Sequence, residues 1–284
     1  MQDILAKLEQ DLALRGLSDS TRYQYRKRIE RYARFVARPL EETGEQDFRG
    51  FLLHLIEDEG LAASTVNCYS AAIVFLYEAV LGRQVDRRQV PRMKRRSRLP
   101  EVPTRAEARA IINAPKNPKH KAMISLAYSA GLRVSEIAAL RVADIDSAGM
   151  RILVRGGKGG KDRYTLLSQE CLKALRDYYR RFRPDHPDGW LFPGVCSPGH
   201  IKRGPVEDAF TAALARSGVK KRMGIHAMRH AFGTHLYEDG VSLLDIKELL
   251  GHASLASTMV YVHLANVAGR VTSPLDVPLG GPGA

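Results

Sequence analysis

Side chains that can act on a phosphodiester gather in residues 226–261. His226 and Arg229 open this segment, and His252 and Tyr261 lie near its end. A phenol is a weak nucleophile at neutral pH unless a base takes its proton or nearby cations lower its pKa. Guanidinium N–H groups can stabilise the negative charge that develops on the non-bridging oxygens. The segment therefore contains groups that could attack a phosphodiester without a metal.

Two further cations precede this segment. Arg133 follows Gly131 at the start of an expected helix, where the macrodipole makes a cation slightly unfavourable; an ordinary surface arginine is the alternative. Lys158 lies in RGGKGGKDR, whose glycines suit a hairpin tip but lack the GxxxxGK[ST] spacing of a nucleotide-binding loop. Lys158 could bind a phosphate or donate a proton, or the segment could be an ordinary polar hairpin. Lys161 is the alternative candidate for any role given to Lys158.

The histidines and the tyrosine admit other interpretations. His226 and His230 are four residues apart, but HAMRH lacks the glutamate of HExxH and Arg229 would repel a cation, so we predict no metal site. His252 follows a helix-ending glycine, where it donates to a phosphate oxygen or simply caps the helix. Tyr261 has apolar neighbours in the sequence, which fits a core tyrosine as well as a nucleophile.

The composition favours a polyanionic partner. Lys and Arg number 44 against 31 Asp and Glu, which gives a formal net charge of +13. A basic surface gains binding free energy by releasing counterions from a nucleic acid, although a merely basic soluble protein is the alternative. The chain has 284 residues, of which 44% are hydrophobic, so it can bury a core in one large or two smaller domains.

Cysteine usage and hydropathy indicate the compartment. Cys68, Cys171 and Cys196 are far apart and form no CxxC pair, so we expect neither a disulfide framework nor a cysteine zinc site. The N-terminal sequence MQDILAKLEQDL lacks the continuous apolar stretch of a signal peptide, and no run approaches the length of a membrane span. The sequence predicts a cytoplasmic protein in a reducing environment.

Residues 1–82 show four stretches of helical periodicity joined by short loops, which predicts a small helical bundle. Ser18 is the expected N-cap of the second helix and Ser64 of the fourth. The second helix is rich in arginine outside its apolar stripe, and we expect Arg22 and Arg26 to contact nucleic acid. The apolar positions of the four helices are Ile4, Leu5, Leu8 and Leu12; Tyr25, Ile29, Tyr32 and Val36; Phe48, Phe51, Leu52, Leu55 and Ile56; and Val66, Tyr69, Ile73, Leu76 and Val80.

Residues 83–103 are expected to link two domains, because they contain three prolines and little helical periodicity. Eight basic residues lie between Arg83 and Arg98. Like charges this dense repel one another unless a polyanion compensates them, so we favour a strap that contacts DNA over a merely solvated loop. The cations expected to contact DNA here are Arg92, Lys94, Arg95, Arg96 and Arg98, together with Lys161 further along the chain.

Residues 104–270 are expected to form one larger domain, mainly helical with a small antiparallel β-sheet. Thr104 and Glu107 resemble a capping box, and the nearly all-apolar residues 121–130 predict a buried helix. Two strands are expected at 150–155 and 164–167, joined by the hairpin GGKGGKD. Further helices are expected at 135–140, 170–182, 207–216, 227–239 and 243–250, and the tail 271–284, rich in Gly and Pro, is expected to be flexible.

One set of residues carries a resemblance to a known family. The ordered set Arg133, Lys158, His226, Arg229, His252 and Tyr261 resembles that of the tyrosine recombinase (phage integrase) family. The phrases AGLRVSEIAAL, HAMRHAFGTHLYEDG and LLGHASLASTMVYVH are similar to the signature boxes of that family. The resemblance covers roughly residues 1–268, more in layout than in motif at the N-terminus, and is closest to Xer-type recombinases and mobile-element integrases. It implies a SAM-like core-binding domain followed by a tyrosine recombinase catalytic domain.

The resemblance also implies a strand exchange that needs no cofactor, metal or ATP. A tyrosine would attack the scissile phosphate, leaving a 3′-phosphotyrosine and a free 5′-hydroxyl. The implied roles are nucleophile for Tyr261, holding the non-bridging oxygens for Arg133 and Arg229, protonation of the leaving 5′-oxygen for Lys158, proton transfer for His226 and a phosphate hydrogen bond for His252.

On the same resemblance, four protomers, alone or with a second recombinase, would assemble on double-stranded DNA at paired binding sites. They would exchange strands through a Holliday junction. Two alternatives stay open: a type IB topoisomerase-like DNA relaxer, and a non-catalytic DNA-binding protein with a decayed site. The complete set of six residues argues against the decayed site.

Overall fold

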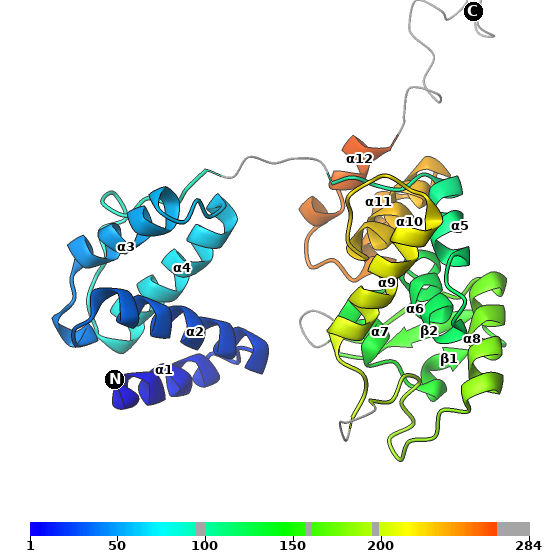
Figure 1. The fold of residues 1–284 in the computed structure, drawn as a ribbon, viewed down its shortest axis with the longest axis horizontal. Helices are drawn as coiled ribbons and strands as arrows, with labels where there is room; N and C mark the ends of the chain where they lie inside the picture. The colour runs from blue at the N-terminus through cyan, green and yellow to red at the C-terminus, as the bar shows by residue number, and fades with distance from the viewer. Residues whose placement is uncertain (95–99, 157–160, 195–198, 266–284) are drawn as a thin grey trace, which may run out of the picture. The chain divides into compact units, whose positions relative to one another are not determined.

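The computed structural model describes residues 1–94, 100–156, 161–194 and 199–265. The chain divides into two compact units, Met1–Ser97 and Arg98–Ala284 (Figure 1). Each unit has its own hydrophobic core. Within the described residues, no helix is both long and apolar enough to cross a membrane.

The first unit is a helical bundle, as expected. Its elements are α1 (Gln2–Leu14), α2 (Asp19–Val36), a 3-10 turn at Leu40–Glu42, α3 (Glu45–Glu57), α4 (Ala63–Phe75) and a π-helical turn at Leu76–Val80. Ser18 caps α2 by accepting a hydrogen bond from the Thr21 N–H, which confirms that prediction. The prediction for Ser64 is wrong, because the carbonyl of Ala62 already accepts the first helical hydrogen bonds and Ser64 lies inside α4.

The segment after the bundle is tied to it. The amide of Asn67 in α4 both donates to and accepts from the backbone of Met93, at 3.0 Å in each direction. The Arg83 Nη1 donates to the Thr43 carbonyl at 2.8 Å, and Val85 and Val90 are buried. The first part of the basic segment therefore packs against the helices of the first unit.

The second unit combines helices with a small sheet. Its helices are α5 (Arg105–Asn113), α6 (Pro118–Ser129), α7 (Val134–Ala138), α8 (Gln169–Phe182), α9 (Arg203–Ser217), α10 (His226–Glu238), α11 (Leu243–Leu250) and α12 (Val260–Leu264). Its strands are β1 (Ile145–Asp146), β2 (Arg151–Val154) and β3 (Arg163–Leu166), and 3-10 turns occur at Val142–Asp144 and Leu255–Ser257. The mainly helical fold with a small antiparallel sheet is confirmed.

The sheet has the antiparallel order β1-β2-β3. The pairing of β2 with β3 sets Ile152 opposite Thr165, and the apolar hairpin pattern predicted both strands. Strand β1 was not predicted, because it is only two residues long and too short to show a period. The sheet brings the start of β3, Arg163, next to the helical part of the site described below.

Helix α6 is the centre of the second unit and contacts α5, α7, α8, α9 and α10 (Figure 1). The buried side chains of Met123, Ile124 and Leu126 confirm the predicted buried helix. After α6 the chain turns at Gly131, where φ is +61° and a Cβ would lie 2.5 Å from the Phe232 ring. This close turn sets Arg133 at the entrance to α7, beside α10 and α11.

Candidate active site

Arg133 is held by the glutamate one helical turn after it. It is the N-cap residue of α7, and its backbone N–H donates to Glu136 Oε2 at 2.8 Å. Its Nη1 donates to Glu136 Oε1 at 2.7 Å, and its Nη2 donates to the Gly251 carbonyl at 3.2 Å. The guanidinium is partly exposed, so it can still face a ligand.

Arg229 lies in α10 with only 1% of its surface exposed. Its Nη1 donates to the Gly131 carbonyl and its Nη2 to the Leu250 carbonyl, each at 2.5 Å. The Leu250 carbonyl ends α11, where the helix dipole favours a cation, and the Gly131 carbonyl lies in the turn just after α6. Burial, together with repulsion from Arg133, lowers the pKa of Arg229 to about 10, which still leaves it charged at neutral pH.

Arg163 is a third guanidinium in this cluster, and the sequence analysis did not select it. Its Nη1 and Nη2 donate to the two carboxylate oxygens of Glu136, each at 2.9 Å, and its Nε donates to the Leu249 carbonyl at 2.9 Å. Burial opposes ionisation of Glu136, but the hydrogen bonds and charges of Arg163 and Arg133 outweigh it and hold its pKa at about 2. The glutamate is therefore an anion surrounded by arginines.

The last turn of α11 rests on these arginines. The consecutive carbonyls of residues 249, 250 and 251 accept hydrogen bonds from Arg163, Arg229 and Arg133 in that order. His252 follows directly, so its position is set by the same contacts. One local pattern indicates part of this arrangement: Arg133 and Glu136 have the three-residue spacing of a capping box.

Tyr261 lies near the start of α12 and is 1% exposed. Its ring packs against Gly233 of α10 and stacks on the His252 ring, with 6.2 Å between ring centroids. From the sequence, either a base or nearby cations could activate the phenol. Burial prevails and raises its pKa to about 12, while Arg229 and Arg133 act in the opposite direction.

The three candidate-site histidines are neutral at pH 7. Burial, with repulsion from Arg229 and Arg133, lowers the pKa of His226 and brings that of His252 to about 4. His230 packs on His226, with ring centroids 4.7 Å apart, and burial with repulsion from His226 and Arg229 lowers its pKa to about 4. The Nδ1 of His252 is hydrogen-bonded to the Thr258 hydroxyl at 3.0 Å.

Five of the six predicted residues thus lie around one cluster: Arg133, His226, Arg229, His252 and Tyr261. Lys158 lies outside the described residues, and its rival Lys161 is exposed at the start of the segment leading into β3. A hollow of about 430 Å³ adjoins the cluster and is lined by Arg133, His226 and Arg203, among others. It offers room for a polyanion beside the guanidiniums.

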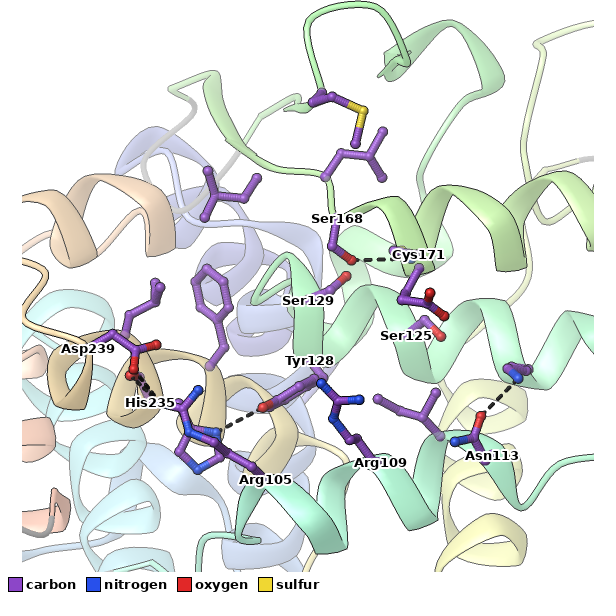
Figure 2. A pocket seen from close by; sticks show the side chains of 18 residues that line it. Arg105, Arg109, Asn113, Ser125, Tyr128, Ser129, Ser168, Cys171, His235 and Asp239 are labelled. Carbon is purple, nitrogen blue, oxygen red and sulfur yellow. Dashed lines mark hydrogen bonds and ion pairs between the residues drawn. The ribbon is translucent and has the colours of Figure 1, made fainter.

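A larger cavity of about 630 Å³ lies elsewhere in the second unit (Figure 2). It is lined by residues of α5, α6, β3, α8 and α10, including Arg109, Ser129 and Cys171, and by none of the five clustered residues. At one side the Tyr128 hydroxyl is hydrogen-bonded to His235 Nδ1 at 3.0 Å. His235 therefore has a packing role away from the candidate site.

The predicted DNA contacts of the first unit are partly paired with acids. Arg22 forms an ion pair with Asp19, and Arg26 donates to Glu30 at 2.9 Å. Arg92 and Lys94 are exposed. The remaining predicted contacts of the basic segment, Arg95, Arg96 and Arg98, lie outside the described residues.

Comparison with known families decides the identity. Residues 102–267 match the model of the phage integrase family, and residues 4–87 match the phage integrase N-terminal SAM-like domain. The chain belongs to the phage integrase family. It is a site-specific DNA recombinase, which cleaves and rejoins DNA.

Similar proteins are also named as recombinases. A putative integrase/recombinase y4qK of Sinorhizobium fredii is 34% identical over 98% of this chain and 90% of the relative. Tyrosine recombinase XerA of Pyrococcus furiosus is 31% identical over 92% of this chain and 90% of the relative. These relatives are recombinases, so the alternative of a topoisomerase-like relaxer is not favoured.

The fold is also that of solved recombinases. The structure of a lambda integrase(75-356) dimer bound to a COC' core site matches with a TM-score of 0.71. The match covers 99% of both chains at 19% sequence identity. At this identity the likeness establishes the architecture, and the roles of single residues need their own argument.

Proposed function

We propose that Tyr261 is the nucleophile of DNA cleavage. Its phenol oxygen attacks the scissile phosphorus, the bond to the 5′-oxygen breaks, and a 3′-phosphotyrosine and a free 5′-hydroxyl form. Arg133 and Arg229 hold the non-bridging oxygens while negative charge grows on them. The observation that carries this proposal is the packing of Tyr261 on Gly233 and His252, within the field of both arginines of its own chain.

The protonation states support the remaining roles. A phenol with a pKa of about 12 needs a base, and the lowered pKa of His226 leaves its imidazole free to accept a proton at neutral pH. His252, also neutral, donates a ring N–H to a phosphate oxygen. Lys158 protonates the leaving 5′-oxygen. Lys161 is the alternative candidate for this role, and substitution of each lysine distinguishes them.

We further propose that both units bind duplex DNA through their arginines and lysines. Arg22 and Arg26 exchange their carboxylate partners for backbone phosphates, which costs little because both pairs are exposed. The basic segment adds contacts through Arg92, Lys94, Arg95, Arg96 and Arg98, and Lys161 adds one from the second unit. Such contacts fix the protein on the duplex without reading sequence.

The active assembly is proposed to be a homotetramer on two paired binding sites, alone or with a second recombinase, that exchanges strands through a Holliday junction. It acts in the bacterial cytoplasm, where its DNA is. Mass photometry on duplex-bound protein tests this: complexes of four protomers with two duplexes are expected. A largest species of one protomer per duplex would contradict the assembly.

Covalent selection tests the chemistry and supplies a substrate. A library of duplexes with randomised sequence is incubated with the protein, denatured in SDS, and DNA linked to protein is recovered and sequenced. The recovered sequence, called the selected duplex below, should form a denaturation-resistant adduct with the wild-type chain and none with Tyr261→Phe. An adduct with Tyr261→Phe, or no adduct with the wild type, would refute the proposed nucleophile.

A further inference from the structure

We infer that Arg163 is a positioning residue for DNA cleavage: it fills two acceptor positions of Glu136 and so keeps Arg229 on its two backbone carbonyls, in position for the phosphate. The inference rests on the role proposed above for Arg229. Arg163 itself contacts neither the substrate nor the nucleophile, and it acts through Glu136.

The contacts of Arg163 are those of a built ion pair. Its side chain is 10% exposed, and its fork-like guanidinium meets both oxygens of Glu136 at 2.9 Å. This paired geometry is the strongest that arginine forms with a carboxylate. Its Nε adds a hydrogen bond of 2.9 Å to the Leu249 carbonyl.

These contacts complete the hydrogen bonding of Glu136. A carboxylate has about four acceptor positions. Oε1 accepts from the Nη1 of Arg133 at 2.7 Å and from the Nη1 of Arg163 at 2.9 Å. Oε2 accepts from the backbone N–H of Arg133 at 2.8 Å and from the Nη2 of Arg163 at 2.9 Å. The carboxylate is therefore saturated.

Arg229 is the next nearest guanidinium to Glu136. Its Nη1 lies 3.6 Å from Glu136 Oε2, close enough for attraction but beyond a hydrogen bond. Its N–H groups instead bind the Gly131 and Leu250 carbonyls. Arg163 thus occupies acceptor positions of Glu136 that Arg229 lies close enough to take.

Removal of Arg163 should change this balance. A buried carboxylate that loses two charge-assisted hydrogen bonds is costly, so it attracts the next nearest guanidinium, that of Arg229. Arg229 then shifts from its two carbonyls onto Glu136. Since a misplacement of about 1 Å in an active site can cost about 10²-fold in rate, cleavage should slow by about that factor.

The test compares Arg163→Met with Arg163→Met/Glu136→Gln, alongside Glu136→Gln alone. The rate of covalent adduct formation is measured in single turnover on the selected duplex at saturating protein, with the Kd for the same duplex measured in parallel. Arg163→Met should cleave about 10²-fold more slowly with a Kd within a few-fold of wild type. The added Glu136→Gln should restore at least about tenfold of the rate, because a neutral amide draws Arg229 far less strongly.

Arg151→Met is the matched control. Arg151 lies on the neighbouring strand β2, paired with Asp146 at 2.8 Å and half exposed, so its loss removes an ion pair of the same sheet without touching Glu136. Its cleavage rate should equal wild type. If Arg163→Met does not fold, the cleavage rates of Arg163→Lys and Arg163→Lys/Glu136→Gln are compared instead. Lysine keeps the charge but cannot form the bidentate contact.

Three results overturn the inference or its basis. The inference is refuted if Arg163→Met cleaves at the wild-type rate. It is also refuted if the double variant cleaves as slowly as Arg163→Met, because Arg163 would then serve only the fold. Adduct formation by Tyr261→Phe in the same assay would refute the proposed function itself, which keeps the two failures apart.

Discussion

The Tyr261 ring rests against Gly233 so closely that a Cβ on residue 233 would lie 2.5 Å from the ring carbon that bears the hydroxyl. The site thus depends on a missing side chain in α10 as much as on the charged groups around it. A glycine inside a helix costs about 1 kcal/mol relative to alanine, and here its use is to admit the ring.

Gly233→Ala is expected to displace Tyr261. The added methyl group stabilises the helix intrinsically but clashes with the buried ring, so adduct formation on the selected duplex should slow by about 10²-fold. The matched control is Gly50→Ala in α3, where a Cβ would meet open space and cleavage should stay unchanged. A Gly233→Ala protein that cleaves at the wild-type rate would show that the phenol works from another position.

Glu136 should make the free energy of unfolding depend on pH. Its folded-state pKa of about 2 lies below the ordinary 4.5, so its stabilising effect is present above pH 4.5 and is lost as the pH falls toward 2. The effect is on the order of 3 kcal/mol. Trp190, the only tryptophan, lies in the second unit, and its fluorescence can follow urea unfolding there. Wild type and Glu136→Gln should differ most near pH 6 and converge toward pH 2; a constant difference would contradict the assignment.

The basic segment should contribute to DNA affinity through charge. Replacing Arg95, Arg96 and Arg98 by Ala should weaken binding and reduce the slope of log Kd against log salt by up to about 3 units, since each phosphate contact contributes about 0.9. Affinity is measured by titration of fluorescent selected duplex at several salt concentrations. The control replaces three exposed arginines of α8, Arg176, Arg180 and Arg181, and removes the same net charge. If the two triple variants change the Kd and its salt dependence equally, the basic segment makes no specific contact with DNA and serves only as a spacer.

Chelation should leave cleavage intact. The proposed chemistry uses only side chains for charge stabilisation and proton transfer, so EDTA should not change the rate of adduct formation on the selected duplex. The comparison is made with and without added magnesium at constant ionic strength, because salt alone changes DNA binding. A strict requirement for magnesium would indicate a metal-dependent nuclease.

Much of the local structure followed from short-range patterns. Ser18 and the pair Thr104 and Glu107 marked helix starts correctly, because a cap is a contact within one turn and its residues are adjacent in sequence. The prediction for Ser64 failed because α4 begins without a side-chain cap: the Ala62 carbonyl accepts the first helical hydrogen bonds, two residues before Ser64.

Composition and residue spacing indicated most of the helices, two of the three described strands and the residues whose chemistry suits phosphodiester cleavage, because these patterns extend over short stretches of chain. How those residues are held depends on contacts that form when the chain folds. Arg163 and Glu136 are 27 positions apart, and Arg229 binds carbonyls 98 and 21 positions away, so no local pattern encodes these contacts. The same holds for the acidity of Tyr261, because burial and the field of distant arginines act through space and set its pKa only once the chain has folded.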